Sequence, residues 1–201
     1  MRAARSLSAV FAVLIGAGCG ASLPPRYVIE HDLGSFAYRR YQKSLEIEVP
    51  IADNPATGHT ASYLRRGASG SVAVVTAFVT VYTHAKALAA EARAALENLA
   101  GYTLTPSEVA GENVWVLDGA GRERWCVWVS NQRIVKIGVQ AGQEFPEPVV
   151  AAYLDLYPTD LDEHGYAREG AASAGKAKAQ IEEEESNDLA VPRDLRENAP
   201  R

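Results

Sequence analysis

Residues 72–82 read VAVVTAFVTVY, an almost unbroken run of apolar and β-branched side chains. A run of this length and composition is typical of a strand that is covered on both faces. A helical pattern follows it, with an N-cap expected at Thr83 and a stop at Gly101. The apolar residues that recur at helical spacing are Leu88, Ala92, Ala95, Leu96 and Leu99.

Downstream of this helix the pattern predicts an antiparallel meander of three strands. The strands are expected at Val114–Leu117, Glu123–Val129 and Arg133–Val139. A Gly-containing turn at Asp118–Gly121 and a tight turn at Asn131–Gln132 separate them. A second helix is then expected, because Pro146 or Pro148 can stand in a first helical turn and Pro158 would end it.

Upstream of the central run, Leu45–Val49 alternates apolar and charged residues, as a half-buried strand does. Pro50–Gly58 contains Asp-Asn-Pro and is expected to form a loop. The sequence therefore predicts one α+β domain over residues 27–166. We expect an antiparallel sheet of about five strands with two helices packed on it.

The amino terminus has the layout of a secretory signal peptide over residues 1–18. Arg2 and Arg5 give the charged start, a short apolar stretch runs from Leu7 to Ile15, and small residues follow. The apolar stretch is shorter than the roughly 20 residues that a membrane-spanning helix needs. We therefore expect export from the cytoplasm.

The end of this segment resembles that of a bacterial lipoprotein precursor. Ala17-Gly18-Cys19 fits the family pattern, while Gly16 stands where the family usually has Leu or another aliphatic residue. The resemblance implies that Cys19 becomes a lipidated N-terminus. It also implies an outer-membrane protein facing the periplasm, with residues 19–26 as a membrane-proximal spacer. The alternative is ordinary cleavage near Ala21 and a soluble periplasmic protein.

The carboxyl-terminal residues 167–201 are rich in Ala, Gly, Lys and Glu and hold few apolar side chains, so we expect a disordered tail. The chain has a formal net charge of -5, and loss of Arg2 and Arg5 would make it more acidic. An acidic chain is a poor candidate for nucleic-acid binding, which depends on Lys and Arg contacts to phosphates.

The sequence contains no nucleotide-binding, zinc-protease or nucleophile-elbow motif, and we expect no catalytic residue, no cofactor and no metal. Its histidines are scattered without metal-ligand spacing; they are His31, His59, His84 and His164. Cys126 lies in an apolar strand and is expected to act as a small buried hydrophobe. If Cys19 kept its thiol, it could form a disulfide with Cys126.

Alternation in the meander predicts one candidate ligand-binding face. Trp125, Val127 and Val129 are expected on the core face, with Val135, Ile137 and Val139 as companions. The opposite face would then hold a tryptophan among cations, which suits an anionic or aromatic ligand. Its binding residues would be Arg122, Arg124, Trp128 and Lys136, beside Cys126 and Ile134. The alternative is that a helix or loop covers Trp128.

Two basic stretches complete the set of candidates. Residues 65–71, RRGASGS, could cradle an anion with backbone amides or form a glycine-rich turn. Residues 38–43, YRRYQK, are expected to form an edge strand guarded by charges.

Two functions of different classes remain. The first is a noncatalytic lipoprotein of the cell envelope, anchored in the membrane through Cys19, that binds a protein or small molecule. The second is a small periplasmic hydrolase whose site is assembled only by the fold. It predicts a pocket that contains acids with perturbed pKa values or a histidine with a partner, and His31 or His84 beside a pocket carboxylate would favour it. The absent motifs favour the first.

Overall fold

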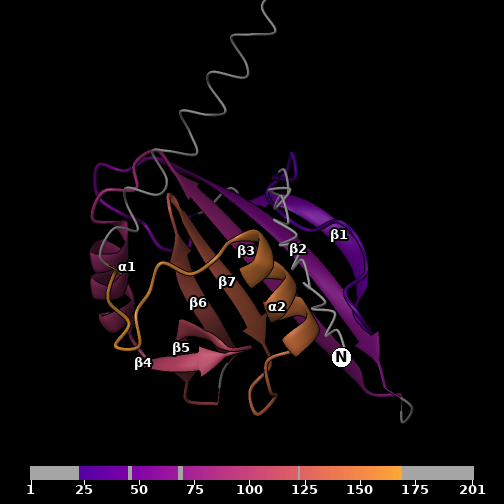
Figure 1. The fold of residues 1–201 in the computed structure, drawn as a ribbon. Helices are drawn as coiled ribbons and strands as arrows, with labels where there is room; N and C mark the ends of the chain where they lie inside the picture. The colour runs from indigo at the N-terminus through magenta and orange to yellow at the C-terminus, as the bar shows by residue number, and fades with distance from the viewer. Residues whose placement is uncertain (1–22, 45–46, 68–69, 122, 169–201) are drawn as a thin grey trace, which may run out of the picture.

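The computed structural model describes residues 23–44, 47–67, 70–121 and 123–168, which form an α+β domain (Figure 1). Seven antiparallel strands lie in the order β1-β2-β3-β7-β6-β5-β4. They are β1 (Ala37–Ser44), β2 (Ala56–Arg66), β3 (Val72–Tyr82), β4 (Tyr102–Val109), β5 (Glu112–Gly119), β6 (Arg124–Ser130) and β7 (Arg133–Val139). Helix α1 (Leu88–Glu97) connects β3 to β4, and α2 (Glu147–Leu156) follows β7.

The sheet consists of two meanders joined along a single pair of strands. Strands β1 to β3 pair in sequence order, as do β4 to β7. The connection through α1 carries the chain to the far edge of the sheet, so β7, rather than β4, pairs with β3. The cross-strand pairs Thr76–Gly138 and Val81–Arg133 bound this central ladder.

Helix α2 covers one face of the sheet, which we call the α2 face (Figure 1). Residues that pair across antiparallel strands point to the same side, and this face includes Tyr63 and Trp128. The Tyr63 and Tyr153 hydroxyls lie 2.8 Å apart, and Trp128 Nε1 donates to Tyr157 O at 2.8 Å. The helix residues buried here are Val149, Val150, Tyr153 and Leu154.

The opposite face, which we call the α1 face, is covered by α1, by the loop that contains Val49 and by the segment around Gly165. Trp115 and Val129 lie on this face, and Tyr82 donates its hydroxyl proton to Val49 O at 2.5 Å. Trp115, Val129 and Tyr82 are all buried, as are Leu88, Ala89, Ala92 and Leu96 of α1. The central strands are thus buried on both sides.

The predicted companions across β6 and β7 are wrong. The two-residue turn Asn131–Gln132 sets Ser130 opposite Arg133, so Trp128 pairs with Val135 and Val129 with Ile134. A one-residue change of register moves every side chain to the other face. The apolar runs do not indicate which residues share a face, because both faces of these strands are covered.

The sheet has seven strands rather than about five. Strand β2 lies partly in the predicted loop Pro50–Gly58, and β4 is an edge strand with exposed Thr, Ser, Pro and Glu. The predicted strand at Leu45–Val49 is wrong, because Ile47–Val49 lies outside any strand and Val49 is buried against Tyr82. The bounds predicted for β3 and β7 and the edge strand over residues 38–43 are confirmed.

Helix α1 begins later than its sequence predicts. Its N-cap is Ala87, in a left-handed conformation with φ 60°, and its C-cap is Asn98 rather than a residue next to Gly101. The predicted cap, Thr83, instead donates its hydroxyl to Pro55 O at 3.0 Å. Helix α2 starts at Pro146 as its N-cap and ends before Pro158, as predicted.

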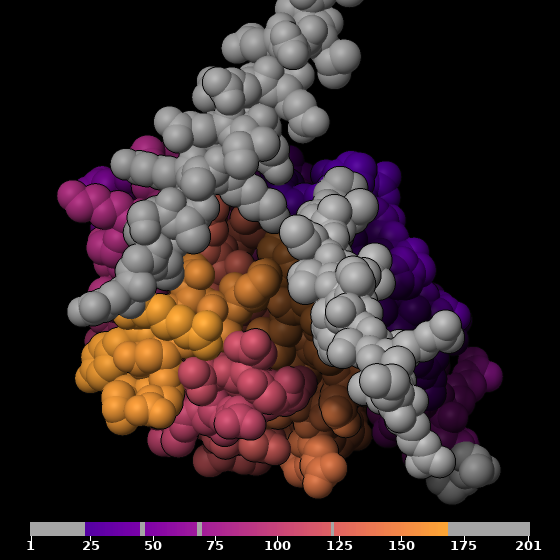
Figure 2. All heavy atoms as spheres, in the orientation of Figure 1, coloured from indigo at the N-terminus to yellow at the C-terminus, as the bar shows by residue number. Residues whose placement is uncertain are grey.

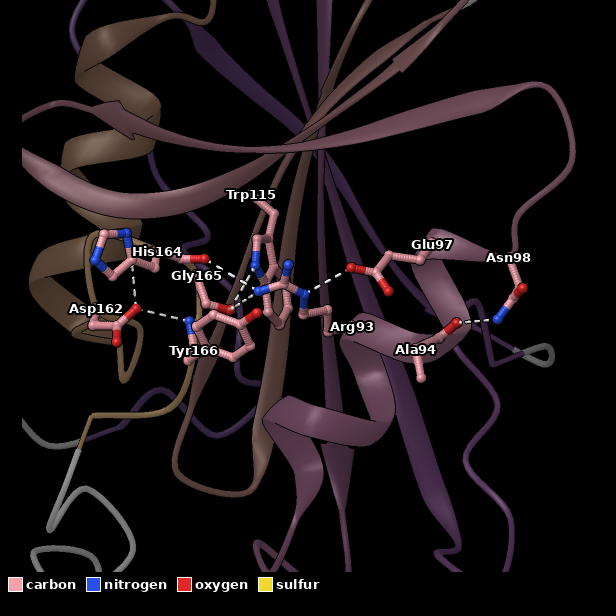
Figure 3. Close-up of polar contacts among 9 residues, drawn as sticks. All are labelled: Arg93, Ala94, Glu97, Asn98, Trp115, Asp162, His164, Gly165 and Tyr166. Atoms are coloured by element: carbon pink, nitrogen blue, oxygen red, sulfur yellow. Dashed lines mark hydrogen bonds and ion pairs between the residues drawn. The ribbon is translucent and has the colours of Figure 1, made fainter.

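The chain after α2 crosses the end of the sheet and docks against α1 (Figure 3). Arg93 donates to the carbonyls of His164 at 3.1 Å and Gly165 at 3.3 Å, and Trp115 Nε1 donates to Gly165 O at 3.1 Å. The Arg93 guanidinium lies 4.2 Å from the centre of the Tyr166 ring. In the space-filling view this segment packs beside β4 (Figure 2). We call this arrangement the carboxyl latch.

Several predictions fall on residues outside the described ranges. They are the signal peptide at 1–18, Cys19 with residues 20–22 of the spacer, Arg122, and the tail beyond Arg168. The structure neither supports nor opposes them. Residues 23–168, as far as they are described, contain no helix with the length and apolar content that a bilayer span requires.

Candidate ligand-binding cleft

A cleft of about 530 Å³ opens on the α2 face, between the amino end of α2 and the adjoining ends of β2, β3 and β7. This volume lies within the range of small-molecule sites, roughly 300–1,000 Å³. Its apolar lining is made by Phe36, Ala73, Val75, Val139, Phe145, Pro146 and Pro148. Its polar lining is made by Ser35, Arg65, Ser71, Gln143, Glu144 and Glu147.

The apolar residues form the floor of the cleft and the charged residues form its rim. Phe36, Val75 and Val139 are buried, with 2%, 1% and 3% of their surface exposed. Arg65 and Glu147 are exposed at the opening. A ligand with an apolar body would therefore bury that body against the floor and keep its polar groups at the rim.

Arg65 is the cation of the rim. Strand alternation places it on the α2 face, opposite Ala73, while Arg66 points to the other face. Its guanidinium lies 4.7 Å from the centre of the Phe36 ring. No carboxylate among the described residues lies within ion-pair distance of Arg65, although Glu144 and Glu147 line the same cleft. Its charge is thus open to a ligand.

Arg124 supports the opposite wall of the cleft. It donates to Gln143 O at 3.3 Å, and its guanidinium lies 5.0 Å from the Phe145 ring centre. Its charge is paired with Asp118. The predicted binding residue Arg124 is therefore next to a cleft, but it positions the wall and does not line the space.

The structure does not bring the other predicted binding residues together. Trp128 is fully buried beneath α2, as the alternative interpretation proposed. Lys136 lies on the α1 face, 3.8 Å from the centre of a Trp125 ring and ion-paired with Glu48. A platform that combines Trp128 and Lys136 is excluded because the sheet itself separates them.

Two residues of the RRGASGS stretch line the cleft, and two of its described amides are used within the stretch itself. The amide of Gly67 donates to Ser71 O at 2.8 Å, and the amide of Gly70 donates to Gly67 O at 3.0 Å. These two amides are engaged within the turn and are not turned toward an anion. Arg65 and Ser71, at the two ends of the stretch, line the cleft.

The cleft lining contains hydroxyls and carboxylates, but no histidine, cysteine or lysine among the described residues. The ring of His31 contacts Asp32 O at 3.0 Å, and His84 contacts Asn54 through its backbone. Among the described residues, neither His31 nor His84 is paired with a pocket carboxylate. The other feature that the hydrolase hypothesis predicts is present once: burial raises the pKa of Asp160, which lines a smaller pocket of about 120 Å³ beside α1.

Cys126 is a free thiol with no exposed surface. Burial raises the pKa of this thiol, so it holds its proton and is a poor nucleophile. No group of three or more His, Cys, Asp and Glu side chains in the described part of the chain is arranged to hold a metal ion. Within the described part of the chain, the cleft offers a binding surface with Arg65 as its cation.

The sequence signal for this cleft was incomplete. The basic stretch at 65–71 and Arg124 were recognisable as charged patches, whereas Phe36 and Phe145 belong to none of the patterns found in the sequence. Only the fold brings Phe36 from before β1 to Phe145 before α2. No family model matches the chain, and no curated protein or solved structure is significantly similar to it.

Proposed function

We propose that this protein is a noncatalytic, exported lipoprotein of the cell envelope that binds a small anionic ligand with an apolar body. Arg65 carries the ligand part of this proposal, because it lines a cleft of mixed polar and apolar character and has no ion-pair partner among the described residues. Residues 1–18, which have the layout of a signal peptide, and Cys19 support the proposed location in the cell envelope. The anchor would hold the domain at the outer membrane, facing the periplasm.

The charge of Arg65 selects the ligand class. A guanidinium presents a planar fork of donors that matches a carboxylate, sulfonate or phosphate group. A hydrogen bond to a charged group contributes about 1.5–3 kcal/mol. Since 1.4 kcal/mol corresponds to a tenfold change in affinity, loss of Arg65 should weaken binding by about 10- to 100-fold.

A fluorescence titration with anilinonaphthalene sulfonate tests the cleft, because this probe combines an apolar body with one anionic group. Arg65→Gln should weaken binding by the factor above. Arg66→Gln is the matched control, since it removes an equal charge from the neighbouring residue on the opposite face. Equal effects of the two substitutions would assign binding to net charge and contradict the proposal.

The mass of the mature protein tests the anchor separately. A diacylglycerol adduct on Cys19 is expected in the membrane fraction, and Cys19→Ala should release the protein into the periplasm. An unmodified N-terminus near Ser22 would instead show a soluble periplasmic protein. That result would leave the cleft proposal intact.

A further inference from the structure

A second cationic site lies on the α2 face at the other end of α2 from the cleft. Arg133 is the first residue of β7 and pairs with Val81. Its guanidinium lies between two tyrosines, 5.8 Å from the ring centre of Tyr27 and 5.6 Å from that of Tyr157. Tyr157 is the C-cap of α2, whereas the cleft lies at Pro146.

The Arg133 charge is not compensated within the described part of the chain. Its Nε is buried and has no hydrogen-bond partner there. None of the described carboxylates is ion-paired with it either. Arg133 as a whole is half-buried, but its Nε is a buried donor without a partner, which costs about 1–3 kcal/mol. The two tyrosine rings offset part of this cost.

Further polar groups gather around Tyr27. Its ring centre lies 4.9 Å from that of His59, and Tyr41 Oη lies 3.0 Å from His59 Nδ1. The charge of Lys43 acts on His59, which is 8% exposed. Two cations, Arg133 and Lys43, thus lie near one patch of aromatic rings, which favours a multiply charged anion over a single carboxylate.

The conformation of Tyr27 is fixed at this place. It has φ 59°, in the left-handed region that non-glycine residues rarely adopt. Its amide donates to Pro24 O at 2.9 Å, and its carbonyl accepts the Tyr157 hydroxyl at 2.7 Å. The two tyrosines that flank Arg133 are therefore joined by a hydrogen bond from the Tyr157 hydroxyl to the Tyr27 backbone carbonyl. The backbone at Tyr27 and the Tyr157 side chain beside Arg133 are therefore held in place.

The geometry points to an oxyanion site in which Arg133, flanked by Tyr27 and Tyr157, binds a phosphate group. Movement of the groups that cover Nε would let its N–H and an adjacent Nη–H donate to two phosphate oxygens. The phosphate can belong to a small soluble molecule or to a phospholipid headgroup. This site is independent of the Arg65 cleft.

The direct test is nuclear magnetic resonance of the arginine Nε–Hε signals during titration of the mature chain with inorganic phosphate at constant ionic strength. The Arg133 signal should shift with saturation, and phosphate should raise the Tm. Arg133→Met should abolish the Tm increase, while Arg65→Gln should retain it. An unmoved Arg133 signal, or an equal Tm increase in Arg133→Met, would overturn the proposal.

Arg133→Lys provides a second variant in case Arg133→Met does not fold, because it keeps the charge and removes the planar fork. We expect it to weaken phosphate binding at least tenfold. Unchanged affinity would show that charge alone suffices, which contradicts a site built on the buried Nε–H.

Vesicles distinguish the two sources of phosphate. The mature chain with Cys19→Ala, which lacks the proposed acyl group, would be sedimented with phosphatidylglycerol or phosphatidylcholine vesicles. Arg133-dependent binding to phosphatidylglycerol would identify a headgroup, and a response to inorganic phosphate alone would identify a soluble ligand. Vesicle binding that Arg133→Met leaves unchanged, without any response to inorganic phosphate, would contradict the proposal.

Discussion

The ring of Trp125 lies directly against Gly138, its cross-strand partner on the α1 face. A Cβ added at Gly138 would stand 2.3 Å from Trp125 Cζ3. The ring is also 5.6 Å from the centre of Phe78 and carries Lys136 above it. Glycine is therefore required in β7 because the tryptophan occupies the space that a side chain would need.

Gly138→Ala should lower the free energy of unfolding by about 1–3 kcal/mol, because the Trp125 ring must move out of a packed position. Urea unfolding would measure this loss. In a Trp125→Leu background the same substitution should cost less, since the ring is gone. Equal costs in both backgrounds would show that the ring contact is not the cause.

The Tyr63 hydroxyl donates to Ile29 O at 2.6 Å and lies 2.8 Å from the Tyr153 hydroxyl. Burial raises the pKa of Tyr153 to about 12, so both hydroxyls are neutral at physiological pH. Tyr63→Phe leaves a buried acceptor without its donor and should cost about 1–3 kcal/mol in urea unfolding. Tyr38→Phe, which removes an exposed bond to Glu30, should cost much less.

Gly165 in the carboxyl latch has φ 72°, and a Cβ there would stand 2.5 Å from Trp115 Nε1. Gly165→Ala should therefore combine backbone strain with a clash and cost more than about 2 kcal/mol. Gly121→Ala is the control, because Gly121 has φ 68° but a Cβ added there would have no atom within 4 Å. Similar unfolding energies for the two variants would contradict a packing role for the latch.

Burial lowers the pKa of His59 below its ordinary value of 6.5, and the charge of Lys43 acts in the same direction. The unfolded chain therefore binds a proton at a higher pH than the folded chain does. Stability should fall as the pH is lowered through 6.5 toward the folded pKa. Urea unfolding at several pH values would reveal this slope. His59→Gln should reduce it, and His84→Gln should not.

Much of the domain could be predicted from its apolar patterns. Strands β3 and β7 have the bounds that their β-branched runs indicate, and α2 starts at its proline. The start of strand β2 was not predicted, because its buried positions include Gly58, His59 and Thr60, which are not apolar residues. Strand β4 was not predicted, because an edge strand buries few of its residues and therefore lacks an apolar pattern.

The sites were harder to predict than the fold because they depend on which face each side chain occupies. Arg124 and Lys136 seemed to share a face until the turn at Asn131–Gln132 set the register. The surroundings of Arg133 are formed by Tyr27 and Tyr157, which lie near opposite ends of the domain sequence. Spacing along the chain carries no information about such distant neighbours.

The pairing of β3 with β7 also has a consequence for biosynthesis. Ribosomes make the β1–β3 meander first, yet β3 has no partner on its second edge until residues Arg133 to Gly138 of β7 have been made. During that interval a long, β-branched strand with no charged residue exposes its hydrogen-bonding groups. A nascent chain of this kind is prone to self-association and suited to capture by a chaperone that keeps it unfolded.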